Sequence, residues 1–331
     1  MKDNTYAILC SVLTGIANLF VWTGYDSHVF IVESVLHSVH GRDNDRVGPH
    51  DGYYGTVLYL CYYLTFQVLN RYLYFTGCAF LGCAFAFFNN GYSGYLTEIS
   101  TRKNLERNQA LSWGVSCMSV FCAGVIYIIV TSMSITDTAQ IKYREYSDSE
   151  IRLFFTAFAI LVTVGLVLFL LHPNRDVDNS IASGRTNVLS VKEQMGSMFT
   201  VLTHRRTMIL LPFYLYIGIY FSFWISVMPT TIQFTKSLAH HIYLPAYFGM
   251  VLTAGSVLMS IATIFLSRRI KNFGMLFIVQ ATFIVVTASV PAWSTVMPND
   301  EPALLFQPSP HSILLIAFLF GIGDAANNTS R

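Results

Sequence analysis

Charged residues are scarce in this sequence. Asp, Glu, Lys and Arg make up 11% of its 331 residues, whereas an ordinary soluble domain carries about 25%. A soluble globule of this size could not cover its surface with so few ionic groups. The formal net charge is only +2, so the chain lacks the broad basic field of a nucleic-acid-binding protein.

Motifs that would indicate catalysis or metal binding are also missing. The six cysteines lie in apolar segments and none forms a CxxC pair, which indicates neither a zinc site nor a secreted disulfide framework. The sequence contains no HExxH motif, no phosphate-binding loop and no evident pairing of a nucleophile with a base. We therefore expect no enzyme, no metal site and no cofactor.

Long apolar runs dominate what is present, since 53% of the residues are hydrophobic. A membrane-spanning helix needs about 20 mostly apolar residues. The run from Tyr6 to Trp22 is longer than the core of a signal peptide and lacks a cleavage site. We expect an all-α, multi-pass membrane protein embedded in the lipid bilayer. The predicted spans are 6–22 (which could continue to His37), 53–69, 72–92, 112–132, 151–171, 208–232, 246–267, 273–292 and 312–326.

Positive charge alternates between the connections. The segments 95–111, 172–207 and 267–272 together hold about 11 Lys and Arg residues, and the opposite set holds about 4. Because Lys and Arg are enriched in cytoplasmic loops, we expect these three segments to be cytoplasmic. The N-terminus is outside if 53–69 and 72–92 both span, and inside if only one does.

The polar stretch 172–207 divides the chain into an N-terminal bundle, 1–171, and a C-terminal bundle, 208–331. Two short motifs recur in the same order in both halves, Gly55 and Gly82 in the first matching Gly249 and Gly321 in the second. The first pair lies closer together by about 45 residues, roughly one helix with its loops. We expect the first bundle to be internally shortened near 66–67; chance matches in an unrelated fold are the alternative.

Several glycine-rich and polar motifs together resemble the uncoordinated-ninety-three (Unc-93-like) family of ion channel regulatory proteins, within the major facilitator superfamily. The resemblance covers nearly the whole chain and is most specific between Gly94 and Trp113. The motifs are Asp51–Gly55, Asn90–Thr101, Glu106–Trp113 and Gly321–Thr329.

The resemblance implies a major-facilitator-like fold of twelve helices in two six-helix bundles joined by 172–207. It also implies a regulator that binds a membrane partner, such as a potassium channel. This chain departs from the family in lacking one helix of the first half, in carrying Ser93 where Gln is usual, and in ending at Arg331 before the last two helices. We therefore expect an incomplete fold with about nine full or partial helices.

Ionisable side chains at membrane depth are the first candidates for ligand or coupling sites. Asp26 and Glu33 follow the first apolar run and either line a central cavity or sit at the membrane interface. Glu98, near Arg107, is a ligand candidate or part of an ion pair or helix cap. Asp324 in the glycine-rich end has a functional or a helix-end role.

Other residues are candidates for helix packing or for gating. Small residues allow helices to approach closely in lipid. The basic turn formed by Arg268, Arg269 and Lys271 either latches helix ends on the cytoplasmic side or simply sets topology. The packing and motif candidates are Gly52, Tyr53, Gly55, Gly91, Gly94, Tyr95, Asn108, Gly321 and Gly323.

Three functions agree with these observations: a non-enzymatic regulator that binds a membrane partner, a facilitator-type transporter of a small solute, and a truncated form without independent activity. A transporter needs a polar cavity at the midplane. The small number of charges within the predicted spans favours the regulator.

Overall fold

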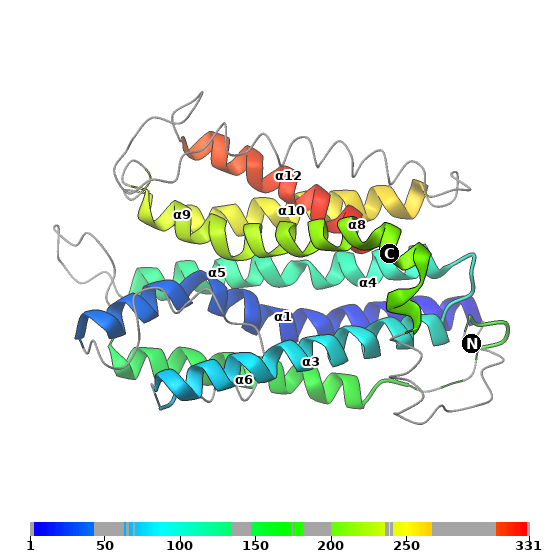
Figure 1. Cartoon of the computed structure of the whole chain (residues 1–331), viewed down its shortest axis with the longest axis horizontal. Helices are drawn as coiled ribbons and strands as arrows, with labels where there is room; N and C mark the ends of the chain where they lie inside the picture. Colours follow the sequence, from blue (N-terminus) through cyan, green and yellow to red (C-terminus); the bar gives the residue numbers. More distant parts are fainter. Residues whose placement is uncertain are drawn as a thin grey trace.

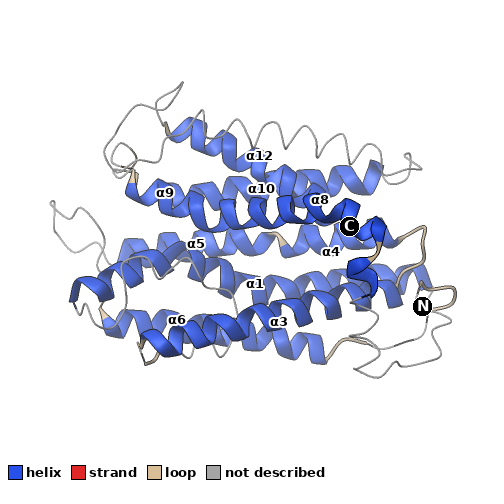
Figure 2. Cartoon of the chain, in the orientation of Figure 1, coloured by secondary structure: helices blue, strands red, loops and turns tan. Residues whose placement is uncertain are grey.

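A computed structural model describes residues 3–42, 63, 66–68, 70–133, 147–173, 175, 177–181, 200–235, 238, 241–266 and 309–329. These residues form helices joined by short turns, and none of them lies in a β-strand (Figure 2). The predicted all-α class is confirmed for this part of the chain. The predicted span 273–292 and most of 53–69 lie outside it.

In the part of the chain that the structure describes, five helices precede residue 171. Asn70 caps the second of them by accepting hydrogen bonds from the amides of Tyr72 and Leu73. Ser147 and Glu150 form a reciprocal capping box at the start of the last one, which fixes its first turn. The helices are α1 (Asp3–Arg42), α3 (Arg71–Glu98), α4 (Leu105–Ser116), α5 (Met118–Met133) and α6 (Asp148–Leu170).

The helices after residue 204 form a second layer on the first (Figure 1). Three of them join end to end into one span, in which a π-helical turn separates two α-helical parts. These are α8 (Arg205–Ser222), the π-turn η2 (Phe223–Val227) and α9 (Met228–Phe234). The others are α10 (Leu244–Leu266) and α12 (Pro310–Thr329).

Six segments of the described chain are long and apolar enough to cross a membrane. In a bilayer core, a continuous helix satisfies its own backbone hydrogen bonds, so such segments span stably. The chain is therefore an integral, multi-pass membrane protein. The six segments are Asp3–Asp26, Leu105–Ile129, Asp148–Phe169, Leu215–Gln233, Leu244–Phe265 and Pro310–Asn328.

Two helices extend further than the predicted spans. α1 continues past residue 22 to Arg42, and its 40 residues correspond to about 60 Å, twice the thickness of the apolar bilayer core. α3 ends at Glu98 and not at residue 92, so Glu98 is the last residue of a helix instead of lying beyond one. The helix α3 tolerates its glycines because Tyr92 and Leu96, which lie one turn apart on it, bury their side chains.

The start of α1 lies at the end of the bundle where the basic connections meet, which we call the basic end. Arg175 donates to Asp3 Oδ1 at 3.0 Å, and Arg107 donates to Asn4 Oδ1 at 2.8 Å. Both termini lie at this end (Figure 1). The N-terminus is therefore on the same side as 95–111 and 172–207; that this side is cytoplasmic stays a prediction from the charge distribution.

Close backbone packing joins α10 to α12. A Cβ at Gly321 would collide with the carbonyl oxygen of Leu252, and a Cβ at Gly255 would collide with that of Phe318. Ser256 also donates to the carbonyl of Gly321 at 2.9 Å. These approaches require glycine, which holds the α10–α12 pair together in lipid through contact and interhelical hydrogen bonding.

Candidate functional site

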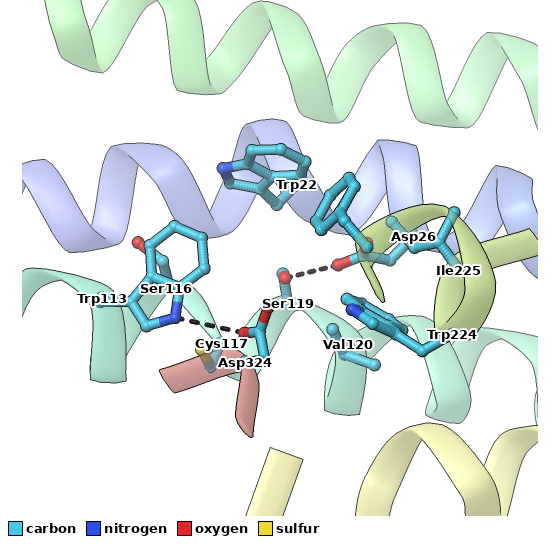
Figure 3. A pocket seen from close by; sticks show the side chains of 11 residues that line it. Trp22, Asp26, Trp113, Ser116, Cys117, Ser119, Val120, Trp224, Ile225 and Asp324 are labelled. Carbon is cyan, nitrogen blue, oxygen red and sulfur yellow. Dashed lines mark hydrogen bonds between the residues drawn. The ribbon is translucent and has the colours of Figure 1, made fainter. Parts of the chain in front are cut away.

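A small cavity lies between the helices of the first half and those of the second (Figure 3). Its volume of about 30 Å³ is enough for about two guests of the size of a water molecule, since one such guest needs roughly 10–15 Å³. The lining side chains come from α1, α4, α5, α8, η2 and α12. They are Trp22, Asp26, Trp113, Ser116, Cys117, Ser119, Val120, Phe221, Trp224, Ile225 and Asp324.

Asp26 enters this cavity from α1. Its side chain is 5% exposed, and its Oδ2 accepts a hydrogen bond of 2.6 Å from the hydroxyl of Ser119 on α5. The sequence left open whether Asp26 lines a central cavity or sits at the membrane interface. The structure places it in the cavity, because α1 continues as a helix beyond residue 22.

Asp324 faces the same cavity from α12 and is also buried. Its Oδ2 accepts a hydrogen bond of 3.3 Å from the indole N–H of Trp113 on α4. Its Oδ1 accepts one of 3.2 Å from the amide of Asn328 on its own helix. Asp26 and Asp324 are 298 positions apart in the sequence, and the fold brings both carboxylates to one small space (Figure 3).

Two breaks in regular α-helix flank the cavity. α4 and α5 meet at Cys117, whose carbonyl oxygen accepts a hydrogen bond of 3.2 Å from Thr253 on α10. The π-turn η2 interrupts the span from α8 to α9 and carries Trp224 and Ile225 to the cavity wall. Single π-turns within α-helices occur frequently at functional sites. Three of the lining residues, Cys117, Trp224 and Ile225, lie at these two breaks.

Trp224 presents a polar group without a partner. Its side chain is 6% exposed, and its Nε1 has no hydrogen-bond acceptor. A buried N–H group that lacks an acceptor costs about 1–3 kcal/mol. Figure 3 shows the indole nitrogen on the side of the ring that is turned toward Ser119 and Asp324.

The α4 and α12 motifs also meet beyond the cavity, toward the basic end. Gln109 donates to the carbonyl of Asn328 at 2.7 Å. Together with the Trp113–Asp324 bond, this contact ties residues 109–113 of the first half to residues 324–328 of the second. The sequence indicated both motifs, but their contact is visible only in three dimensions.

Three of the candidate residues lie at the basic end. Asn108 is buried and donates to Ser100 Oγ at 2.9 Å, and Arg107 donates to Asn108 Oδ1 at 3.0 Å. Tyr95 donates to the carbonyl of Pro173 at 3.0 Å. These contacts order the α3–α4 connection and the start of 172–207 and lie outside the cavity.

Glu98, Gly94 and Gly323 are not among the residues that line the cavity. Glu98 is exposed at the end of α3, and a Cβ at Gly94 would meet no atom within 4 Å. Gly323 packs against the hydroxyl of Tyr220. Glu33 lies in α1 and Gly91 in α3, where the structure describes their backbones. Residues outside the described part of the chain are Gly52, Tyr53, Gly55, Arg268, Arg269 and Lys271.

Sequence reasoning missed several residues of the cavity. Trp22, Ser119 and Trp224 lie within apolar runs and look like ordinary lipid-facing or packing residues. A tryptophan in the middle of a span is a weak signal, because tryptophan in membrane proteins is enriched at the interfaces instead. No spacing rule relates these residues to Asp26 or Asp324, which lie on other helices.

A comparison with protein families agrees with the motifs and with the helical bundle. The chain matches the family described as ion channel regulatory protein UNC-93 over residues 49–331. The match begins beyond α1 and includes α4 and α12, whose motifs meet at the cavity. It covers well over half of the sequence, so the chain belongs to the UNC-93 family of ion channel regulatory proteins.

Proposed function

We propose that this protein regulates an ion channel by binding to it within the membrane, and that it has no catalytic activity. The observation that carries the proposal is the family match over residues 49–331. The spans supply the membrane location that such a partner requires. A potassium channel is the partner that we would test first.

The size of the cavity between the halves supports a regulator. Sites for small organic molecules usually enclose about 300–1,000 Å³, whereas this cavity has about 30 Å³. Its lining includes Trp113 from the first half and Trp224 from the second. An organic solute therefore does not fit in this cavity, whereas the outside of the bundle is open to a protein partner.

The polar groups in the cavity also support a non-catalytic role. The hydroxyl of Ser119 donates to Asp26, but no histidine or lysine lines the cavity to act as a general base for it. Nucleophilic catalysis by serine normally requires such a base. The arrangement holds two carboxylates in place and provides no activated nucleophile.

Co-purification and electrophysiology together test the proposal. The tagged chain should co-purify in mild detergent with a potassium channel, and its co-expression should change the current carried by that channel at equal surface density. A multi-pass protein of another family, with the same tag and expression level, serves as the control. An unchanged current across the channels tested, with the chain purifying alone, would argue against regulation by binding.

A facilitator-type transporter is the second candidate, and one observation favours it. Asp26 and Asp324 come from different halves of the chain and face a shared cavity, as coupling groups do in transporters with two rocking bundles. This function would use the predicted major-facilitator arrangement. Saturable solute uptake by the purified chain in liposomes, with no channel present, would favour this candidate over the regulator.

A further inference from the structure

We propose that the cavity between the halves is a binding site for one monovalent cation with its water, held between Asp26 and Asp324. The cation is either an alkali metal ion or a proton carried on water, which deliver the same charge to the carboxylates. The inference rests on the cavity alone and does not depend on whether the protein regulates a channel or transports a solute.

The charges of the residues that line the cavity favour a positively charged ligand. Asp26 and Asp324 are both more than nine-tenths buried, and they interact electrostatically with each other. The eleven lining residues include no lysine, arginine or histidine. A buried carboxylate is costly unless it is paired or neutralised, so one cation placed between the two would relieve both the burial and the repulsion.

Trp224 gives independent evidence for a guest that carries oxygen. Its buried N–H lacks an acceptor and is turned toward the space beside Ser119 and Asp324 (Figure 3). Buried waters typically bond to groups of this kind. A bare cation could not accept this hydrogen bond, but a water bound to the cation could. A hydrated cation therefore satisfies both the carboxylates and the indole.

The size and chemistry of the lining select the class of cation. Ca²⁺ takes six to eight oxygen ligands and Mg²⁺ keeps an octahedral shell, which a cavity of about 30 Å³ cannot hold with its waters. The described part of the chain contains no cluster of three or more His, Cys, Asp and Glu residues that could bind a metal ion. Trp22 and Phe221 also line the cavity, and aromatic rings attract cations.

Other ionisable side chains near the two carboxylates leave this charge balance unchanged. Among the described residues, Tyr63, Cys117, Cys122 and Tyr220 interact electrostatically with Asp26 or Asp324. Phenols and thiols are ordinarily neutral at pH 7. These four groups therefore add no charge to the site at neutral pH.

Cation binding can be measured on the full chain in nanodiscs, because three of the lining residues are tryptophans. NaCl or KCl replaces N-methylglucamine chloride at constant ionic strength and pH 7, while tryptophan fluorescence and the thermal unfolding midpoint are recorded. We expect a saturable change in both, since a ligand that binds the folded state stabilises it. Asp26→Asn and Asp324→Asn should each weaken the apparent affinity about tenfold or more. Glu98→Gln, at the exposed end of α3, should leave it unchanged.

A second variant and a direct measurement guard against misfolding of the aspartate variants. Trp224→Phe keeps both carboxylates and removes the unpaired N–H, so it should weaken binding less than either aspartate variant does. Binding of ²²Na⁺ to the unmodified chain, competed by unlabelled Na⁺ or K⁺, needs no variant.

Measurements at several pH values decide whether the bound cation is an alkali metal ion or a proton. If Na⁺ and K⁺ have no effect, but the unfolding midpoint rises from pH 8 to pH 5 in N-methylglucamine chloride and Asp26→Asn and Asp324→Asn remove that rise, the cation is a proton. The proposal is overturned if the unmodified chain shows neither a saturable alkali-ion response nor a pH response that depends on these aspartates.

Discussion

Helices α6 and α12 are both apolar enough to cross a membrane, yet they occupy opposite environments. In the apolar stretch of α6, 28% of the residues are buried, compared with 56% in α12. α6 presents large aliphatic side chains outward, including Leu153, Ile160 and Val167. The second half of α12 instead carries Gly321, Asp324 and two asparagines, and it packs between α10 and α4.

The difference shows how lipid reverses the usual reading of an amphipathic helix. In water a helix turns its polar side inward only at a cost, whereas in a bilayer the polar and small residues belong inside the bundle. α6 keeps a narrow inner stripe, Ile151, Phe155, Phe158 and Val162, each at most 2% exposed. These positions recur at helical spacing, and the rest of α6 is free to face lipid.

The largest expected effect is at the inner stripe of α6. Phe155 is fully buried and stacks on Phe66 with a centroid distance of 3.7 Å. Phe155→Ala should lower the free energy of unfolding by about 3 kcal/mol or more, because it removes a large side chain from a packed core. SDS titration in bicelles with a fluorescence readout measures this quantity.

Ile160→Ala provides the matched control on the same helix. Ile160 is 60% exposed, so its loss exchanges one apolar contact with lipid for another and should change the free energy of unfolding by less than about 0.5 kcal/mol. Equal costs for the two substitutions would show that α6 is not divided into a packed face and a lipid face.

Replacing glycine by alanine should have a smaller effect on the free energy of unfolding, and that effect should differ between a packed and an unpacked glycine. Gly321→Ala forces a methyl group onto the backbone of Leu252 and should destabilise the protein by about 2 kcal/mol. Gly218→Ala in α8 meets nothing within 4 Å and should be neutral or stabilising by up to about 1 kcal/mol, because alanine favours helix. The same SDS titration compares them, and a Gly321→Ala variant as stable as the Gly218→Ala variant would contradict the close α10–α12 packing.

Hydropathy and motifs in the sequence predicted the helical membrane class, the family and the approximate positions of the described spans. The predicted starts and ends fail where polar residues continue a helix. α4 begins at Leu105, seven residues before the predicted start at 112, because Asn108 is buried within the bundle and donates to Ser100 Oγ. A hydropathy window counts such residues as loop.

The cavity could be predicted only in part. Asp26 and Asp324 stood out because a carboxylate near a span is rare. Their meeting could not be predicted, because it depends on how α1, α4 and α12 pack and on the π-turn that positions Trp224.

The proposed shortening of the first bundle stays a prediction. Phe66 and Gln67, at the expected junction, pack on α6, where Gln67 donates to Thr156 at 3.1 Å.

Photolabelling from the lipid phase tests the contrast between α6 and α12 most directly, because it needs no substitution. A diazirine-bearing lipid is activated with the unmodified chain in nanodiscs, and the labelled residues are mapped by mass spectrometry. We expect labels on Leu153, Ile160 and Val167 of α6 and none between Gly321 and Asn328 of α12. Strong labelling of 321–328, or an unlabelled α6, would contradict the claim that the end of α12 is packed inside the bundle while α6 faces the lipid.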